Sequence, residues 1–231
     1  MKEYGRFSKP QYIYEGNQVF DGKKSVNNTI YRRLFGLLDE ELDRVESLDS
    51  CVTATCKLYK SKIIKDNDIL FLDTKKIGTE DALFNISVFS HVEKCIFIKE
   101  YLYHYRKTNE NSLTSIKKEN LKEKWFYLFD LMQEHIDTNK LNVNFQESLD
   151  NRVSLSFIGV ALNEVFSTSG HRSNYKNIIN LTQDQRYVDA IQRINTKNMN
   201  RHWKLFYYLL KNKMFPIVFI MLLVIKRIIR K

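Results

Sequence analysis

The sequence predicts an α/β fold, with an incomplete sheet flanked by helices, followed by a helical C-terminal region. Two segments of the N-terminal half have the β-branched or alternating pattern of strands, CVTATCKLY at 51–59 and KCIFIKEYLYHYR at 94–106. A helical pattern lies between them, and the remainder of the chain reads as helix. With 231 residues, 43% of them hydrophobic, the chain can bury one sizeable core.

The expected helices of the N-terminal half follow a polar, turn-rich segment at 1–25. The first helix starts near Ser25, and a second covers about 79–91 after the break at Gly78. Residues 66–68 form a turn before the short apolar piece at 69–72. The apolar residues at helical spacing are Val26, Ile30, Leu34, Leu37, Leu38, Leu42 and Val45 in the first helix and Ala82, Leu83, Ile86, Phe89 and Val92 in the second.

Longer helical patterns fill the rest of the chain. One begins at Leu121 with the spacing of an amphipathic helix, a long one lies near 145–167, and shorter ones lie near 174–195. We therefore expect three parts. They are a partial α/β half at 1–115, a helical region at 116–197 and a basic, hydrophobic tail at 198–231.

The positive charge of the chain is confined to its C-terminal end. The net charge is +10, the last acid is Asp189, and ten cations follow it, so residues 1–189 are formally neutral. This distribution argues against a globally basic nucleic-acid binder and for attraction to an anionic membrane. The three cysteines form no CxxC or Cys/His cluster, which indicates a reducing, cytosolic compartment. The first 16 residues lack the apolar stretch of a signal peptide.

The tail contains twelve uncharged residues, MFPIVFIMLLVI at 214–225. As a helix they span about 18 Å, against roughly 30 Å of bilayer hydrocarbon. We expect 203–231 to form an in-plane anchor or shallow hairpin at a membrane surface, with basic residues attracted to anionic lipid. The alternative is a hydrophobic helix packed on the body. Stacking of Trp203 and Phe206 on single-stranded nucleic acid is a third interpretation, but the apolar run favours lipid.

Glu80 and Asp81 open the helix after Gly78. Thr79 is a good N-cap, and acids in a first turn are stabilised by the helix dipole by roughly 0.3–1 kcal/mol each. On these residues alone, the two acids need do no more than start a helix.

The surrounding motifs add a second interpretation. Residues 56–114 resemble the second half of the bacterial family 2 glycosyltransferases of polysaccharide synthesis, which have a GT-A fold. The matching pieces, in the order of that family, are Lys57-Leu58-Tyr59, Gly78, Glu80-Asp81, Leu83-Phe84-Asn85, Leu102-Tyr103-His104-Tyr105-Arg106 and Asn111-Ser112-Leu113-Thr114. Thr79 is inserted between the glycine and the acids. The resemblance implies a partial GT-A-like half for 1–115.

The resemblance also implies roles for single residues. Asp81 corresponds to the general base that takes a proton from the acceptor hydroxyl in an inverting transfer, and Glu80 to its neighbour that positions Asp81 or binds the acceptor. Lys57, His104 and Arg106 are then candidates for donor or acceptor binding, since an Arg suits the diphosphate of a nucleotide sugar. In the alternative interpretation, Tyr103 and Tyr105 lie in the core and His104 and Arg106 face solvent.

The donor-binding features of that family are missing from the sequence. Its opening apolar strand and its Asp-x-Asp motif, which binds Mg²⁺ or Mn²⁺, would precede Met1. A divalent cation is therefore expected for the complete enzyme, but no residue of this chain is a candidate metal ligand. Asp66-Asn67-Asp68 follows no buried strand, and Asp73 is followed by Lys75 and Lys76, so neither imitates the metal motif well.

We therefore expect a glycosyltransferase for capsule or exopolysaccharide synthesis, or the acceptor-side half of one, with the missing half supplied by a partner chain or by a true start upstream of Met1. Its partners would be a nucleotide sugar, a lipid-linked acceptor and a separate chain that supplies the missing half. Its location would be cytoplasmic, peripheral at the inner face of the cell membrane, with no nucleic acid bound. The alternative is a non-catalytic, truncated membrane-associated remnant or partner subunit without a donor site.

Overall fold

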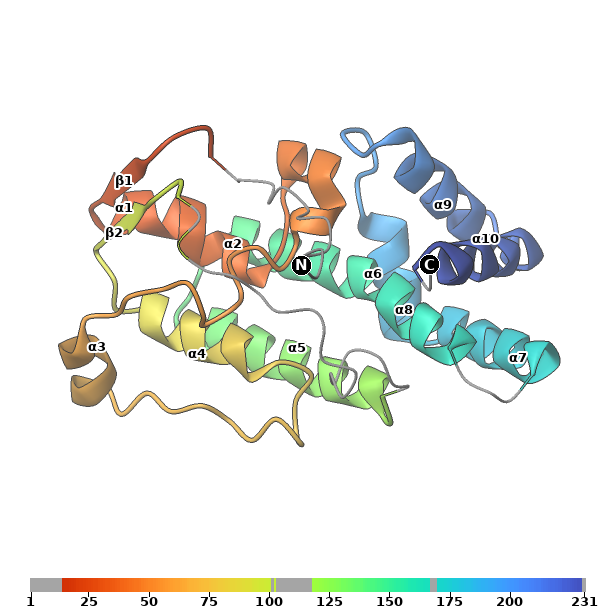
Figure 1. Cartoon of the computed structure of the whole chain (residues 1–231), viewed down its shortest axis with the longest axis horizontal. Coiled ribbons are helices and arrows are strands. Elements are labelled where there is room, and N and C mark those ends of the chain that lie inside the picture. Colours follow the sequence, from red (N-terminus) through yellow and green to blue (C-terminus); the bar gives the residue numbers. More distant parts are fainter. Residues whose placement is uncertain (1–13, 101, 103–117, 167–169, 230–231) are drawn as a thin grey trace, which may run out of the picture.

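The computed structural model describes residues 14–100, 102, 118–166 and 170–229. This part of the chain is mostly helical, with one small antiparallel sheet (Figure 1). The helical C-terminal region is thus confirmed. In chain order the elements are β1 Gln18–Asp21, α1 Lys23–Val26, the π-helical turn η1 Asn27–Tyr31, α2 Arg32–Phe35, the 3₁₀ helix η2 Asp39–Ser47, α3 Ser61–Asp66, α4 Glu80–Phe89, β2 Lys94–Phe97, α5 Leu121–Thr138, α6 Val143–Val165, α7 His171–Thr182, α8 Gln185–Arg193, α9 Arg201–Lys211 and α10 Phe215–Ile229.

The sheet differs from the one expected. β1 and β2 pair in antiparallel register, with Val19 opposite Ile96. The segment 94–106 gives a strand over Lys94–Phe97 alone, and its residues 101 and 103–106 lie outside the described part. The described residues contain no further strand, so they do not form the larger sheet expected of a GT-A-like half.

The strand predicted at 51–59 is wrong. These residues form turns and extended loop, because Cys51 and Val52 end a turn in the core and Cys56 has a left-handed φ of 63°. A residue with positive φ interrupts the pleat of a strand. The alternation in the sequence therefore reflects a buried turn followed by an exposed loop.

The first predicted helix is confirmed in position but divided. Helical backbone runs from Lys23 through Phe35 and stops at Gly36, and η2 follows. A side chain at Gly36 would lie 1.9 Å from the carbonyl oxygen of Ser148, so only glycine allows this close approach to α6. The helices predicted at 79–91, from 121, near 145–167 and near 174–195 correspond to α4, α5, α6, and α7 with α8.

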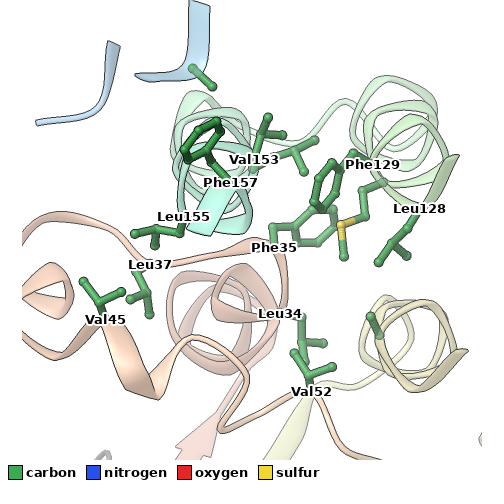
Figure 2. Close-up of a cluster of buried hydrophobic side chains, with 14 of the residues drawn as sticks. Leu34, Phe35, Leu37, Val45, Val52, Leu128, Phe129, Val153, Leu155 and Phe157 are labelled. Carbon is green, nitrogen blue, oxygen red and sulfur yellow. The ribbon is translucent and has the colours of Figure 1, made fainter. Parts of the chain in front are cut away.

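α6 is the central helix of the core. Figure 2 shows Leu37 beside Leu155 of α6 and Phe35 beside Phe129 of α5, whereas Leu34 lies next to Val52. Residues all around α6 are buried, and α2, α5, α7 and α8 pack on it. The helices before and after residue 115 thus share one apolar cluster.

Buried arginines fasten the N-terminal helices to α6. Arg32 and Arg33 both pair with Glu41, at 2.5 and 3.0 Å. Arg152 of α6 donates to the carbonyl of Phe35 at 2.9 Å and pairs with Asp49 at 2.8 Å. These charges are inside the protein because each has a carboxylate or carbonyl partner.

The tail forms a helical hairpin. α9 and α10 pack on each other, and α10 also packs on α6 and α7 (Figure 1). None of the described helices is both long enough and apolar enough to cross a bilayer.

Candidate functional site at the start of helix α4

α4 begins as the sequence predicts. Thr79 is the extended N-cap residue, and Glu80 and Asp81 occupy the first turn. The Thr79 side chain makes no capping hydrogen bond, so the acids and the helix dipole favour this start without it. Both acids are partly exposed, whereas Ala82 behind them is fully buried.

Asn85 ties this first turn to the loop at 51–59. Its side-chain nitrogen donates to the carbonyl oxygens of Val52, at 2.7 Å, and of Asp81, at 2.9 Å. Its side-chain oxygen accepts a 2.9 Å hydrogen bond from the hydroxyl of Tyr59. Asn85 is fully buried, and these bonds satisfy its amide.

An aromatic cluster supports the same region. The ring of Tyr59 meets the ring of Phe84 edge-on, with 5.5 Å between centroids, and the ring of Phe71 stacks on Phe84 at 3.9 Å. The structure thus brings together two motifs that are 26 positions apart in the sequence. Tyr59 belongs to the first motif, and Phe84 and Asn85 belong to the second.

Lys57 lies close enough to Asp81 for their charges to interact. Burial lowers the pKa of Lys57, while Cys51 and Asp81 act in the opposite direction. Its ammonium group donates to the carbonyl of Thr53, and no ion pair with Asp81 is found in the described part. Burial, together with the charge of Asp81, raises the pKa of Tyr59 to about 12. The charge of Asp81 therefore acts on both the Lys57 ammonium group and the Tyr59 hydroxyl.

Trp125 of α5 packs against Gly78, which lies just before α4. A Cβ on Gly78 would lie 1.9 Å from Cδ1 of the Trp125 ring. The sequence predicts Gly78 as a helix break, but the structure assigns it a second reason, which is contact with this indole. The sequence around Gly78 gives no indication of this contact with Trp125.

The remaining predicted site residues fall into two groups. His104 and Arg106 lie outside the described residues, as do Tyr103 and Tyr105, so both interpretations of that strand stay predictions. The predicted turn at 66–68 is confirmed, since α3 ends at Asp66.

No metal site is found where the structure can be described. Asp73 accepts a 2.9 Å hydrogen bond from the backbone of Lys75, so it shapes a turn. No group of three potential metal-ligating side chains occurs among the described residues.

The site is a surface feature and not an enclosed pocket. A cavity of about 400 Å³ lies elsewhere, between α5, α6 and α7, and neither Glu80 nor Asp81 lines it. Phe71, which stacks on Phe84, is half exposed, and Leu58 and Leu70, the sequence neighbours of Tyr59 and Phe71, are 103% and 81% exposed. A carboxylate at a helix N-terminus can accept a proton from a bound hydroxyl.

Comparisons with known proteins give no family assignment. No protein-family model matches the chain, and neither a curated protein nor a solved structure matches it. The resemblance to family 2 glycosyltransferases therefore stays a prediction that rests on the motifs.

Proposed function

We propose that the chain is the acceptor-side half of an inverting glycosyltransferase. It transfers a sugar from a nucleotide sugar to a lipid-linked or growing polysaccharide acceptor. Asp81 is the general base, Glu80 positions the acceptor, and Lys57 contributes to binding. The nucleotide pocket and the Mg²⁺ or Mn²⁺ site come from outside these residues.

The observation that carries the proposal is the fixed start of α4. Asn85 bonds to the backbone of Asp81 and of Val52, and to Tyr59, so the first turn is held against the Lys57 loop. A general base has to be held at a defined position relative to the reacting hydroxyl.

The exposed apolar side chains next to the site also support the proposal. Leu58, Leu70 and Phe71 are exposed and are either sequence neighbours of Tyr59 and Phe71 or in contact with Phe84. A donor-binding half placed here would cover them and would bring the sugar donor to Asp81.

A non-catalytic partner subunit is the second candidate. It fits the same Asn85 hydrogen bonds, because a buried amide needs hydrogen-bond partners whether or not a substrate binds nearby. In that case the α4 network keeps a scaffold together and Asp81 has no substrate.

Ligand binding by the purified chain separates these two functions. Saturation-transfer NMR with lipid-linked saccharides from the source cells tests the acceptor site, and nucleotide sugars with Mn²⁺ test the donor site. We expect acceptor binding that Asp81→Ala and Lys57→Ala weaken, and no donor binding. Asp66→Ala is the matched control, because Asp66 is an exposed acid at the end of α3.

Two results would count against the proposal. Absence of acceptor binding favours the non-catalytic partner. Donor binding at micromolar concentration by the isolated chain contradicts a donor pocket outside these residues.

The proposed location is the inner face of the cell membrane, where the chain is peripheral. A lipid-linked acceptor is found at such a surface, and the cations of the C-terminal tail suit anionic lipid.

A further inference from the structure

α10 is fixed to the body of the protein by one of its faces. Val218 and Leu222, one turn apart, are fully buried. Phe219 meets the ring of Tyr175 on α7 edge-on at 5.3 Å. One turn beyond Leu222, the ammonium group of Lys226 donates to the carbonyl oxygen of Val165, at 2.6 Å, at the end of α6. This face therefore behaves as part of the folded core.

The opposite face of α10 is apolar and exposed. We call it the α10 outer face, and it consists of Ile217, Ile220, Val224 and Ile228. Their exposed fractions are 42%, 59%, 50% and 68%. The spacing of three, four and four places them along one side of the helix. Such a continuous stripe of large aliphatic side chains on a surface indicates an interaction site.

Exposed cations lie at both ends of the α10 outer face. Lys213 precedes the helix and Arg227 lies in its last turn, and both are exposed. Lys211 and Lys226 differ, because each donates to a backbone carbonyl of the body. No acid occurs after Asp189, so no negative side chain of the tail offsets Lys213 and Arg227.

We propose that the α10 outer face docks flat on an anionic lipid bilayer. Ile217, Ile220, Val224 and Ile228 enter the interface between headgroups and acyl chains, and Lys213 and Arg227 contact lipid phosphates. The inference rests on the membrane location proposed above and adds which residues make the contact.

The geometry of α10 selects the orientation. Its 15 residues span about 22 Å, less than the roughly 30 Å of bilayer hydrocarbon. Insertion would also require breaking the contacts of Val218, Leu222 and Lys226 with the body. The docked helix therefore lies in the plane of the membrane and keeps its inner face on α6 and α7.

A second copy of the chain is a less suitable partner for this face. A two-fold, antiparallel pairing of α10 helices would place Lys213 of one copy near Arg227 of the other. Like charges at both ends of such a pair oppose association. Anionic lipid has the complementary charge.

Vesicle sedimentation with the full chain tests the proposal. The probes are vesicles of phosphatidylcholine alone and vesicles with about one third phosphatidylglycerol, since about 1 kcal/mol per cation is expected near an anionic surface. We expect binding to the anionic vesicles that falls at high salt. The double variant Ile220→Ser, Val224→Ser should lower it at least tenfold, and Lys213→Gln with Arg227→Gln should weaken the preference for anionic lipid.

Matched control residues lie in the N-terminal half of the chain, far from α10 in the sequence. Leu58→Ser with Leu70→Ser changes two exposed aliphatic residues, and Lys60→Gln with Lys62→Gln changes two exposed cations. Both control proteins should bind vesicles like the wild type. Circular dichroism confirms that all variants are folded.

Three outcomes would overturn the inference. They are no binding to either vesicle, unchanged binding in the Ile220 and Val224 variant, and a dimer in light scattering that this variant abolishes. Sedimentation measures lipid binding without sugar transfer, so its failure leaves the assignment of Asp81 untouched.

Discussion

Tyr59 donates a 2.9 Å hydrogen bond to the side chain of Asn85, which in turn donates to the backbone of Asp81. The phenol of the loop and the first turn of α4 are thereby joined through one buried amide. The position of the Asp81 carboxylate thus depends on Asn85, a buried residue that need not contact a substrate.

Replacing Asn85 should therefore loosen this turn. Asn85→Leu leaves the carbonyl of Val52 and the hydroxyl of Tyr59 without their buried partner, so we expect a loss of about 1–3 kcal/mol in the free energy of unfolding. Tyr59→Phe keeps the ring on Phe84 and should cost only about 1 kcal/mol. Urea denaturation measures both, and equal effects of the two variants would contradict the central place of Asn85.

Gly78 should not accept a side chain. Gly78→Ala places a methyl group 1.9 Å from Trp125, so the indole or the start of α4 has to move. We expect a loss of about 1–3 kcal/mol. Gly16→Ala is the control, because a Cβ there meets nothing within 4 Å. If both variants melt at the wild-type temperature, the contact with Trp125 is not tight.

Glu41 should be important for stability because two buried arginines share it. Glu41→Gln removes the partner of Arg32 and Arg33, for which we expect a loss of about 3–5 kcal/mol. A Tm near that of the wild type would show that the arginines find other partners.

The ion pairs of Glu41 with Arg32 and Arg33 also predict that stability depends on pH. Burial raises the pKa of Glu41, but the hydrogen bond and charge of Arg32, with Arg33, outweigh it and hold the pKa below the usual 4.5. The folded state therefore binds this proton less readily than the unfolded state, and the contribution is complete above pH 4.5 and is lost as the pH falls below it. Unfolding curves of wild type and Glu41→Gln should converge at low pH, and a constant difference between them would contradict this assignment.

The sequence allowed the helices to be predicted better than the sheet. Amphipathic spacing is a local property, and α4 and α5 lie where it predicts them. β1 depends on pairing with β2, more than 70 positions later, and its four residues carry no signal of that partner. At 51–59 a buried turn produced the alternation of a strand.

The site and the tail could be predicted only in part. The motifs place Glu80 and Asp81 at a helix start, and the structure agrees. The buried role of Asn85 and the contact of Gly78 with Trp125 depend on tertiary packing, which no local pattern contains. In α10 nearly every residue is apolar, so hydrophobicity alone does not tell the face on α6 from the outer face.

Sugar transfer with and without the Asp81 carboxylate shows whether Asp81 is the general base. Cells that lack the gene are complemented with wild type, Asp81→Asn or the control Asp66→Asn, and incorporation of labelled sugar into lipid-linked saccharide is measured in their membranes. The account predicts that wild type and Asp66→Asn restore incorporation, whereas Asp81→Asn, folded and equally abundant, gives at least a hundredfold less. Incorporation by Asp81→Asn at the wild-type rate would contradict it, and α4 would then begin with acids that serve the helix alone.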